Sequence, residues 1–283
     1  NELVLHFSWF KSFYGLKMNN SKEKKPDRKL LKKSPNFFSE IINIVKNSRV
    51  IPCFIGFQIE KHFKDDSIIN FEYSYLKYTN KVITNSTKIV SKSHIPLFGA
   101  KNSEIMIFKT YVGGLEHVVL KIGRIKNKKP VNLRIQSSCM TGEVFQSMKC
   151  DCGEQLDKSI QYIANNGGGI IIHLDQEGRG IGLANKIRAY NFQKKGLDTF
   201  KSNHKIGFKD DERDYAIAVK ILKSLNIKKV NVITNNLDKL NSLKKNNIKV
   251  NKIIHMYPTI NNFNLQYLNK RMEKSKYRIF KKK

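Results

Sequence analysis

Three cysteines have the spacing of a metal site. Cys139, Cys150 and Cys152 form a C-x10-C-x-C pattern, and three thiolates bind zinc at about 2.3 Å each, leaving one tetrahedral position open. An open position favours a catalytic zinc over a structural one. Two alternatives to a catalytic zinc site are three core cysteines grouped by chance and a closed structural site in which Cys53 is the fourth ligand. Because Cys53 lies far upstream, we expect the open site.

A glycine-rich turn follows about twenty-five residues later. It comprises Glu177, Gly178, Arg179 and Gly180, and it directly follows a strongly apolar segment. The pattern is neither a Walker sequence nor a dinucleotide fingerprint, because the third glycine is missing. Backbone N–H groups at a helix start, beside an arginine, can still hold a phosphate. The alternative is a tight strand-to-helix connection with a solvated arginine.

A third group joins a carboxylate and a guanidinium. Asp211 and Arg213 are two residues apart at a predicted helix entrance. Alone, this pattern is more typical of a helix cap with an exposed ion pair. His173 and His204 are single histidines, which are more often structural than ligands, so we leave both out of the site.

Alternating elements must position these groups. Apolar patterns predict strands over 105–108, 116–123, 130–136, 169–174, 230–234 and 248–254, with helices after Cys152, after Gly182, from the acidic cluster 210–212, and over 237–245. We expect Thr141 to cap a short helix that carries Val144, Phe145 and Met148. Residues 199–207 should form a loop. Strands that alternate with helices predict an α/β domain.

Composition narrows the class of protein. The chain has 283 residues, 53 Lys plus Arg against 23 Asp plus Glu, and a formal charge of +30. A surface with this much positive charge attracts polyanions. The excess of Lys and Arg is spread over the whole chain, however, so nucleic acid is not the expected ligand. Clustered cysteines indicate a reducing compartment rather than disulfides. No apolar run reaches the roughly twenty residues of a membrane span, so we expect a soluble, cytoplasmic protein without a membrane partner.

Differences in composition and apolar patterning divide the chain into three parts. We expect residues 1–92 to be a basic, partly disordered N-terminal extension of unknown role with one helix near 37–46, residues 93–270 to be the catalytic domain, and residues 271–283 to be a basic tail. The chain begins with Asn1, which indicates a processed or truncated start. The first twenty residues fit a disordered lead-in or the remnant of an organelle-targeting peptide.

Taken together, these motifs closely resemble GTP cyclohydrolase II, the zinc enzyme that opens riboflavin synthesis by hydrolysing GTP. The resemblance covers roughly residues 93–270. The matching stretches are 139–142 (CMTG), 150–156 (CDCGEQL), 176–190 (QEGRGIGLANKIRAY), 196–199 (GLDT), 211–215 (DERDY) and 234–236 (TNN).

The resemblance implies a fold, cofactors and residue roles. The fold would have mixed β-sheets with flanking helices, and the cysteines would hold one Zn2+ per chain, with Mg2+ on the GTP phosphates of a homodimeric enzyme. Asp211 would be the proton acceptor, Arg213 the nucleophile toward the α-phosphorus, and Tyr190 a neighbour of the reacting ring. The implied substrate-binding residues are Arg134, Ile135, Gln136, Ser137, Ser138, Gln155, Glu177, Gly178, Arg179, Thr199, Thr234 and Lys239.

The sequence departs from the family pattern beside the first ligand. The family usually has His and Glu where this chain has Gln136 and Ser138, and Asp175 stands where arginine is frequent. Two main hypotheses follow. One is a zinc hydrolase that converts GTP to 2,5-diamino-6-(ribosylamino)-pyrimidinone 5'-phosphate, formate and pyrophosphate. The other is a regulatory zinc- and nucleotide-binding homologue with impaired catalysis. A basic nucleic-acid binder with a structural zinc is a third, weaker reading.

Overall fold

The computed structural model describes residues 36–50, 52, 73–110, 114–125, 129–265, 267–269 and 272, so Cys53 lies outside the described residues. The chain divides into two compact units, residues 1–79 and 80–283. In the first, α2 (Asn36–Asn47) matches the helix predicted near 37–46. The helix α3 (Tyr73–Ser86) runs across the division. Among the described helices, none has the length and apolarity to cross a bilayer.

The second unit is built on one seven-stranded mixed sheet with the order β1-β2-β3-β5-β4-β6-β7. Neighbours from β1 to β5 run antiparallel, and those from β5 to β7 run parallel. The mixed α/β prediction is therefore confirmed. The strands are β1 (Lys88–His94), β2 (Ser103–Lys109), β3 (Glu116–Ile122), β4 (Val131–Ser137), β5 (Gly169–Leu174), β6 (Lys229–Ile233) and β7 (Lys249–Ile254).

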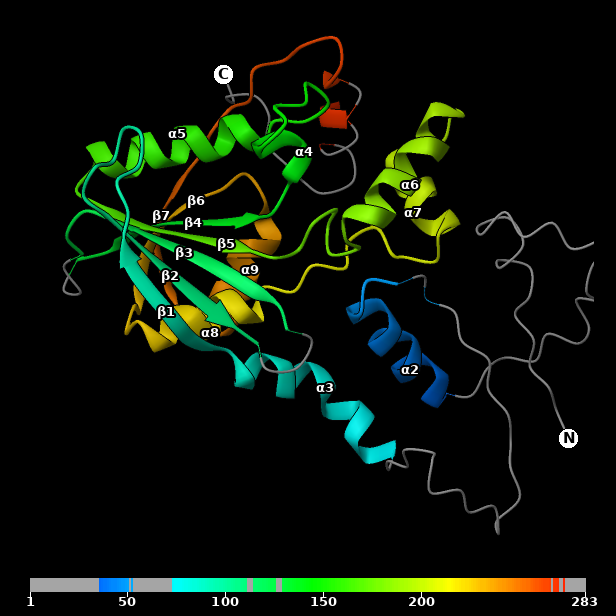
Figure 1. Cartoon of the computed structure of the whole chain (residues 1–283). Coiled ribbons are helices and arrows are strands. Elements are labelled where there is room, and N and C mark those ends of the chain that lie inside the picture. Colours follow the sequence, from blue (N-terminus) through cyan, green and yellow to red (C-terminus); the bar gives the residue numbers. More distant parts are fainter. Residues whose placement is uncertain are drawn as a thin grey trace, which may run out of the picture. The chain divides into compact units, whose positions relative to one another are not determined.

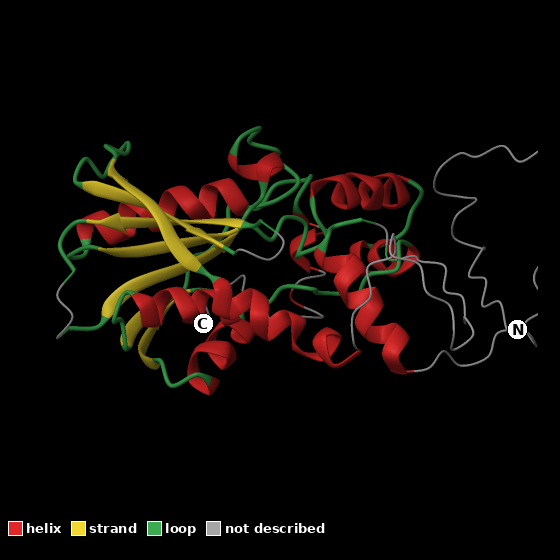
Figure 2. Cartoon of the chain, turned by 60° about the horizontal axis from the view of Figure 1, so that its bottom comes forward, coloured by secondary structure: helices red, strands yellow, loops and turns green. Residues whose placement is uncertain are grey.

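Helices cover both faces of this sheet (Figure 1). One face packs against α5 (Cys152–Asn165), and the other packs against α8 (Ala216–Ser224) and α9 (Leu237–Lys245). The short α4 (Met140–Glu143) follows β4, while α6 (Leu183–Lys194) and α7 (Thr199–Lys205) lie beyond the carboxyl ends of the central strands. Figure 2 shows the two helical layers on either side of the strands.

The alternation along β4 decides which side chains reach the site. Leu133 and Ile135 belong to the apolar cluster under α8 and α9. Arg134 and Gln136 therefore point to the opposite face, where both contact residues of α5. This is also the face on which the cysteines at the end of β4 and the start of α5 meet.

Three local expectations are wrong. Residues 199–205 form α7 instead of a loop, because the Asp198 carboxylate caps the helix by accepting the Lys201 N–H at 2.8 Å. The acidic cluster 210–212 precedes α8, which begins only at Ala216. The helix α4 ends at Glu143, so the side chains expected on it are exposed. Those side chains are Val144, Phe145 and Met148.

The edge strand β1 begins at Lys88, inside the segment expected to be an extension. Its pairing with β2 makes these residues part of the sheet. No periodic apolar pattern marks the strand, since all seven of its side chains are exposed.

Candidate active site

Three elements bring the cysteines together. Cys139 follows β4 at the start of α4, Cys150 lies in the loop between helices, and Cys152 is the first residue of α5. Their Sγ atoms all lie within 4.8 Å of one another, and those of Cys139 and Cys150 are 3.7 Å apart. Tetrahedral bonds of 2.3 Å would separate two sulfurs by about 3.8 Å. The three thiols therefore fit a zinc ion.

Two glycines make this convergence possible. A Cβ on Gly142 would lie 2.7 Å from Cys150 Sγ and 3.3 Å from Cys139 Sγ. A Cβ on Gly153 would lie 2.3 Å from the Gly142 carbonyl oxygen. A side chain at Gly153 would clash with the backbone of α4, and one at Gly142 would clash with the thiols themselves.

A buried lysine lies beside the thiols. The Lys186 ammonium donates to Thr141 Oγ1 at 2.7 Å and Glu177 Oε1 at 2.8 Å, and it approaches Cys139 Sγ to 3.2 Å. Burial alone would lower its pKa, but the Cys139 thiolate and the Glu177 carboxylate raise the Lys186 pKa well above its ordinary value. This fixed positive charge favours the thiolate form of Cys139. Sequence reasoning missed Lys186, although its i,i+4 spacing from Tyr190 places both on one face of α6.

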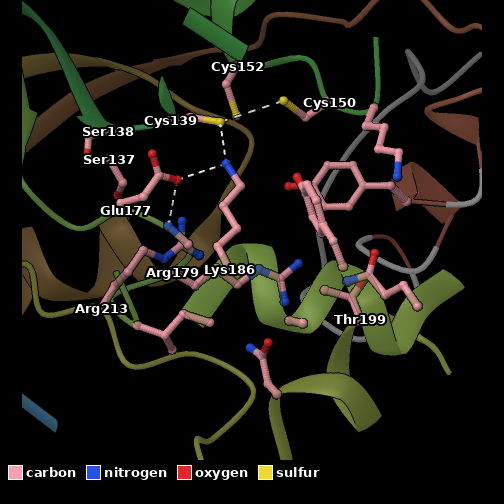
Figure 3. A pocket seen from close by; sticks show the side chains of 18 of the residues that line it. Ser137, Ser138, Cys139, Cys150, Cys152, Glu177, Arg179, Lys186, Thr199 and Arg213 are labelled. Carbon is pink, nitrogen blue, oxygen red and sulfur yellow. Dashed lines mark hydrogen bonds and ion pairs between the residues drawn. The ribbon is translucent and has the colours of Figure 1, made fainter. Parts of the chain in front are cut away.

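Glu177 connects the glycine-rich turn to the cysteine loop. Besides Lys186, its carboxylate accepts the Met140 N–H at 2.6 Å and the Gly178 N–H at 2.9 Å. Negative charge at the first residue of α4 suits the helix N-terminus. The Glu177 side chain is thus occupied by contacts within the protein (Figure 3).

Arg179 occupies a strained position in this turn. Gly178, Arg179 and Gly180 all have positive φ, at 64°, 65° and 90°, a region that non-glycine residues rarely adopt. The Arg179 guanidinium lies 4.8 Å from the Phe200 ring centre. The strained turn places Arg179 on the wall of the same cavity as the thiols.

Asp211 and Arg213 form a bidentate pair. Arg213 Nε and Nη2 donate to the Asp211 carboxylate at 2.9 and 2.5 Å. Burial would raise the Asp211 pKa, but the guanidinium of Arg213, and then that of Arg179, hold it below its usual range. The carboxylate is therefore ionised at neutral pH.

One cavity of about 500 Å³ joins the thiols to most of the predicted residues. It is lined by Arg134, Gln136, Ser137, Ser138, Cys139, Cys150, Cys152, Gln155, Glu177, Gly178, Arg179, Tyr190, Thr199, Arg213 and Lys239. It is also lined by Lys149, Lys186, Lys194 and Phe263, which the sequence did not single out. Cationic groups therefore line the same space as the thiols.

Three predicted residues lie outside this lining. Ile135 is fully buried in the core, and its backbone carbonyl accepts the Lys239 ammonium at 2.6 Å. Thr234 Oγ1 accepts the Asn236 N–H at 3.0 Å at the start of α9. Asp211 reaches the cavity through Arg213. Ile135 and Asp211 thus each contact a residue that lines the space, whereas Thr234 holds the start of α9.

The two histidines lie at different places. His173 Nε2 is 2.8 Å from the Glu143 carboxylate, close to the cysteine loop. His204 is exposed and lies 2.8 Å from the Asp210 carboxylate. Only His173 is connected to the site.

Comparison with known proteins gives a consistent family. The sequence model described as GTP cyclohydrolase II matches residues 88–255. The chain is 43% identical over 174 residues to GTP cyclohydrolase-2 of Buchnera aphidicola, which covers 62% of this chain and 89% of that protein. It is 39% identical over 194 residues to GTP cyclohydrolase-2 of Azospirillum brasilense, covering 68% of this chain and 50% of the relative.

A third relative is longer still. "Riboflavin biosynthesis protein RibBA" of Endomicrobium trichonymphae is 38% identical over 171 residues, or 60% of this chain and 42% of its own length. The chain thus spans about half the length of the Azospirillum and Endomicrobium proteins and most of the Buchnera protein.

Proposed function

Because this chain belongs to the GTP cyclohydrolase II family, we propose that it hydrolyses GTP to 2,5-diamino-6-(ribosylamino)-pyrimidinone 5'-phosphate, formate and pyrophosphate, the first step of riboflavin biosynthesis. One observation carries the proposal. The metal-fitting thiols and a set of guanidinium and ammonium groups open onto the same cavity of about 500 Å³. A nucleoside triphosphate needs both a reactive site for its base and cations for its phosphates.

Cys139, Cys150 and Cys152 would hold one zinc ion per chain. When bound there, zinc supplies a water molecule acidic enough to be a nucleophile near neutral pH. The guanine imidazole carbon, which leaves as formate, would therefore lie at the thiol end of the cavity. Tyr190 would then be a neighbour of the reacting ring. It lines the cavity, and its ring lies 4.9 Å from the ammonium of Lys149, which directly precedes Cys150.

The triphosphate would lie among Arg179, Arg213 and Lys239, with Mg2+ on its oxygens. A nitrogen of the Arg213 guanidinium would attack the α-phosphorus, and pyrophosphate would leave. Asp211 would take the proton that this nitrogen loses. Water would then cleave the phosphorus–nitrogen bond, releasing the monophosphate and restoring the guanidinium. The bidentate Asp211–Arg213 pair supports these roles, because it holds the Asp211 carboxylate against the guanidinium whose proton it would take.

We further propose a cytoplasmic homodimer, with residues 93–270 as the catalytic domain, residues 1–92 as an extension apart from the β1 residues within it, and residues 271–283 as a tail. A homologue that binds nucleotide without turnover is the less favoured alternative, because the relatives carry the names of enzymes.

The test is GTP turnover by the full chain. Zinc-loaded protein with Mg2+ should release formate and pyrophosphate in equal amounts, quantified in separate assays. Well-folded, zinc-loaded protein that binds GTP but releases neither product would refute the proposal and support the non-catalytic alternative. Pyrophosphate without formate would refute the assignment of the ring-opening site alone.

A further inference from the structure

A buried polar network lies behind the thiols on the α5 face of β4. At its centre, the Arg134 side chain donates from Nε and Nη2 to Gln136 Oε1 at 2.9 and 2.6 Å. Arg134 is 4% exposed and Gln136 is 3% exposed. Burying such groups costs free energy unless their hydrogen bonds are made, so their contacts indicate what the network does.

The first branch of the network reaches Cys139. Gln136 Nε2 donates to Glu143 Oε1 at 2.8 Å. The other carboxylate oxygen of Glu143 accepts the Cys139 backbone N–H at 3.2 Å and lies 2.8 Å from His173 Nε2. The backbone of the first thiol residue is thereby tied to two neighbouring strands, β4 and β5.

The second branch reaches the other two thiol residues. Arg134 Nη2 donates to Gln155 Oε1 at 2.5 Å, and Gln155 Nε2 donates to a carboxylate oxygen of Asp151. Asp151 separates Cys150 from Cys152 in the chain. Gln136 Nε2 also lies 3.3 Å from the Cys152 carbonyl oxygen. One amide side chain is thus in contact with both branches.

We propose that Gln136 and Glu143 are positioning residues that hold the three thiols at zinc spacing before the metal binds. Cys139 and Cys150 lie on short connections rather than inside long elements, so their separation must be fixed from outside. Gln136 suits this task because its amide offers both an acceptor for Arg134 and donors for Glu143 and the Cys152 carbonyl. The inference rests on the proposed function only in taking zinc as the metal.

These hydrogen bonds give a role to Gln136, which stands where the family usually has His. A carboxylate in place of Gln136 could accept from Arg134 but could not donate to Glu143. An apolar side chain could do neither. Gln136 is therefore an integral part of the site.

The experiment compares two polar-to-apolar changes on one face of one strand in the full chain. Gln136→Met removes the contacts of the network. Asn132→Met is the matched control: Asn132 is 6% exposed on the same face of β4, but it donates to the carbonyls of Asn166 and Gly168, away from the thiols. Zinc affinity is measured by competition with a chromophoric chelator, and ligand geometry by the absorption spectrum of the Co2+-loaded protein.

We expect Gln136→Met to raise the zinc Kd by about 10- to 100-fold and to alter the Co2+ ligand-field bands. Asn132→Met should lower thermal stability without changing the zinc Kd or the Co2+ absorption spectrum. Gln136→His, whose ring offers one donor and one acceptor, should restore much of the affinity. Equal effects of the two Met variants, or an unchanged zinc Kd in Gln136→Met, would overturn the proposal.

A second variant covers failure to fold. If Gln136→Met gives no folded protein by circular dichroism, Glu143→Gln decides, because it keeps the shape of the side chain and removes its charge. A zinc Kd within about twofold of the parent would then overturn the proposal, and a tenfold rise would support it. Neither reading involves GTP, so a chain that binds zinc tightly without turning GTP over would refute the proposed function alone.

Discussion

Gly142→Ala should weaken zinc binding without unfolding the chain. A Cβ at this position would lie 2.7 Å from Cys150 Sγ, about 1 Å closer than ordinary contact of roughly 3.5–4.0 Å. Metal–ligand distances tolerate only about 0.2 Å, so Cys150 must leave the coordination sphere. The zinc-free chain can adapt, because Gly142 has no positive φ and Cys150 lies on a loop.

The expected rise in the zinc Kd follows from the number of ligands. Zinc binding in four-ligand sites contributes about 10–16 kcal/mol, or about 3 kcal/mol per ligand, which corresponds to about a hundredfold in Kd. Chelator competition measures this Kd. The control is Val144→Ala, two positions on, where the side chain is 65% exposed and the zinc Kd should not change. A Gly142→Ala protein with a zinc Kd within about threefold of the parent would refute the steric reasoning.

Three further predictions concern the turn, the ion pair and the metal. Arg179→Gly relieves a positive φ but removes a cation and its contact with Phe200, so the free energy of unfolding should stay within about 1 kcal/mol while the KM for GTP rises about tenfold or more; an unchanged KM would contradict the phosphate role. The lowered pKa of Asp211 contributes stability above its unfolded pKa of about 3.9 and loses it as pH falls through the lower folded pKa. Because Asp211 is 37% exposed, Asp211→Asn should cost at most about 1 kcal/mol at pH 7, and urea midpoints of the two proteins should converge as the pH falls below the folded pKa of Asp211. Removing zinc with a chelator should accelerate amide hydrogen exchange in residues 139–156 and leave β6 and α8 protected; uniform acceleration would contradict a local role of the metal.

Much of the fold could be predicted from sequence because its signals are local. The strand β5, buried except at His173, follows from the apolar run at its centre, and α5 follows from apolar residues at helical spacing. The edge strand β1 and the helix α7 could not be predicted in this way. β1 is exposed along its whole length, and α7 is a seven-residue helix whose start depends on the Asp198 cap.

The sequence alone identified the candidate metal ligands, since C-x10-C-x-C is informative without any knowledge of the fold. It also located the turn around Arg179 and the pair of Asp211 and Arg213, because each is contiguous in the chain.

Only the tertiary structure decided how these groups are used. It buried Lys186 between a thiol and the Glu177 carboxylate, and it directed Glu177 to the start of α4. It also placed Gln136, which stands where the family usually has His, between Arg134 and Glu143. The physical reason is that each of these contacts joins different elements of the fold, through strand parity and helix packing that local spacing does not encode.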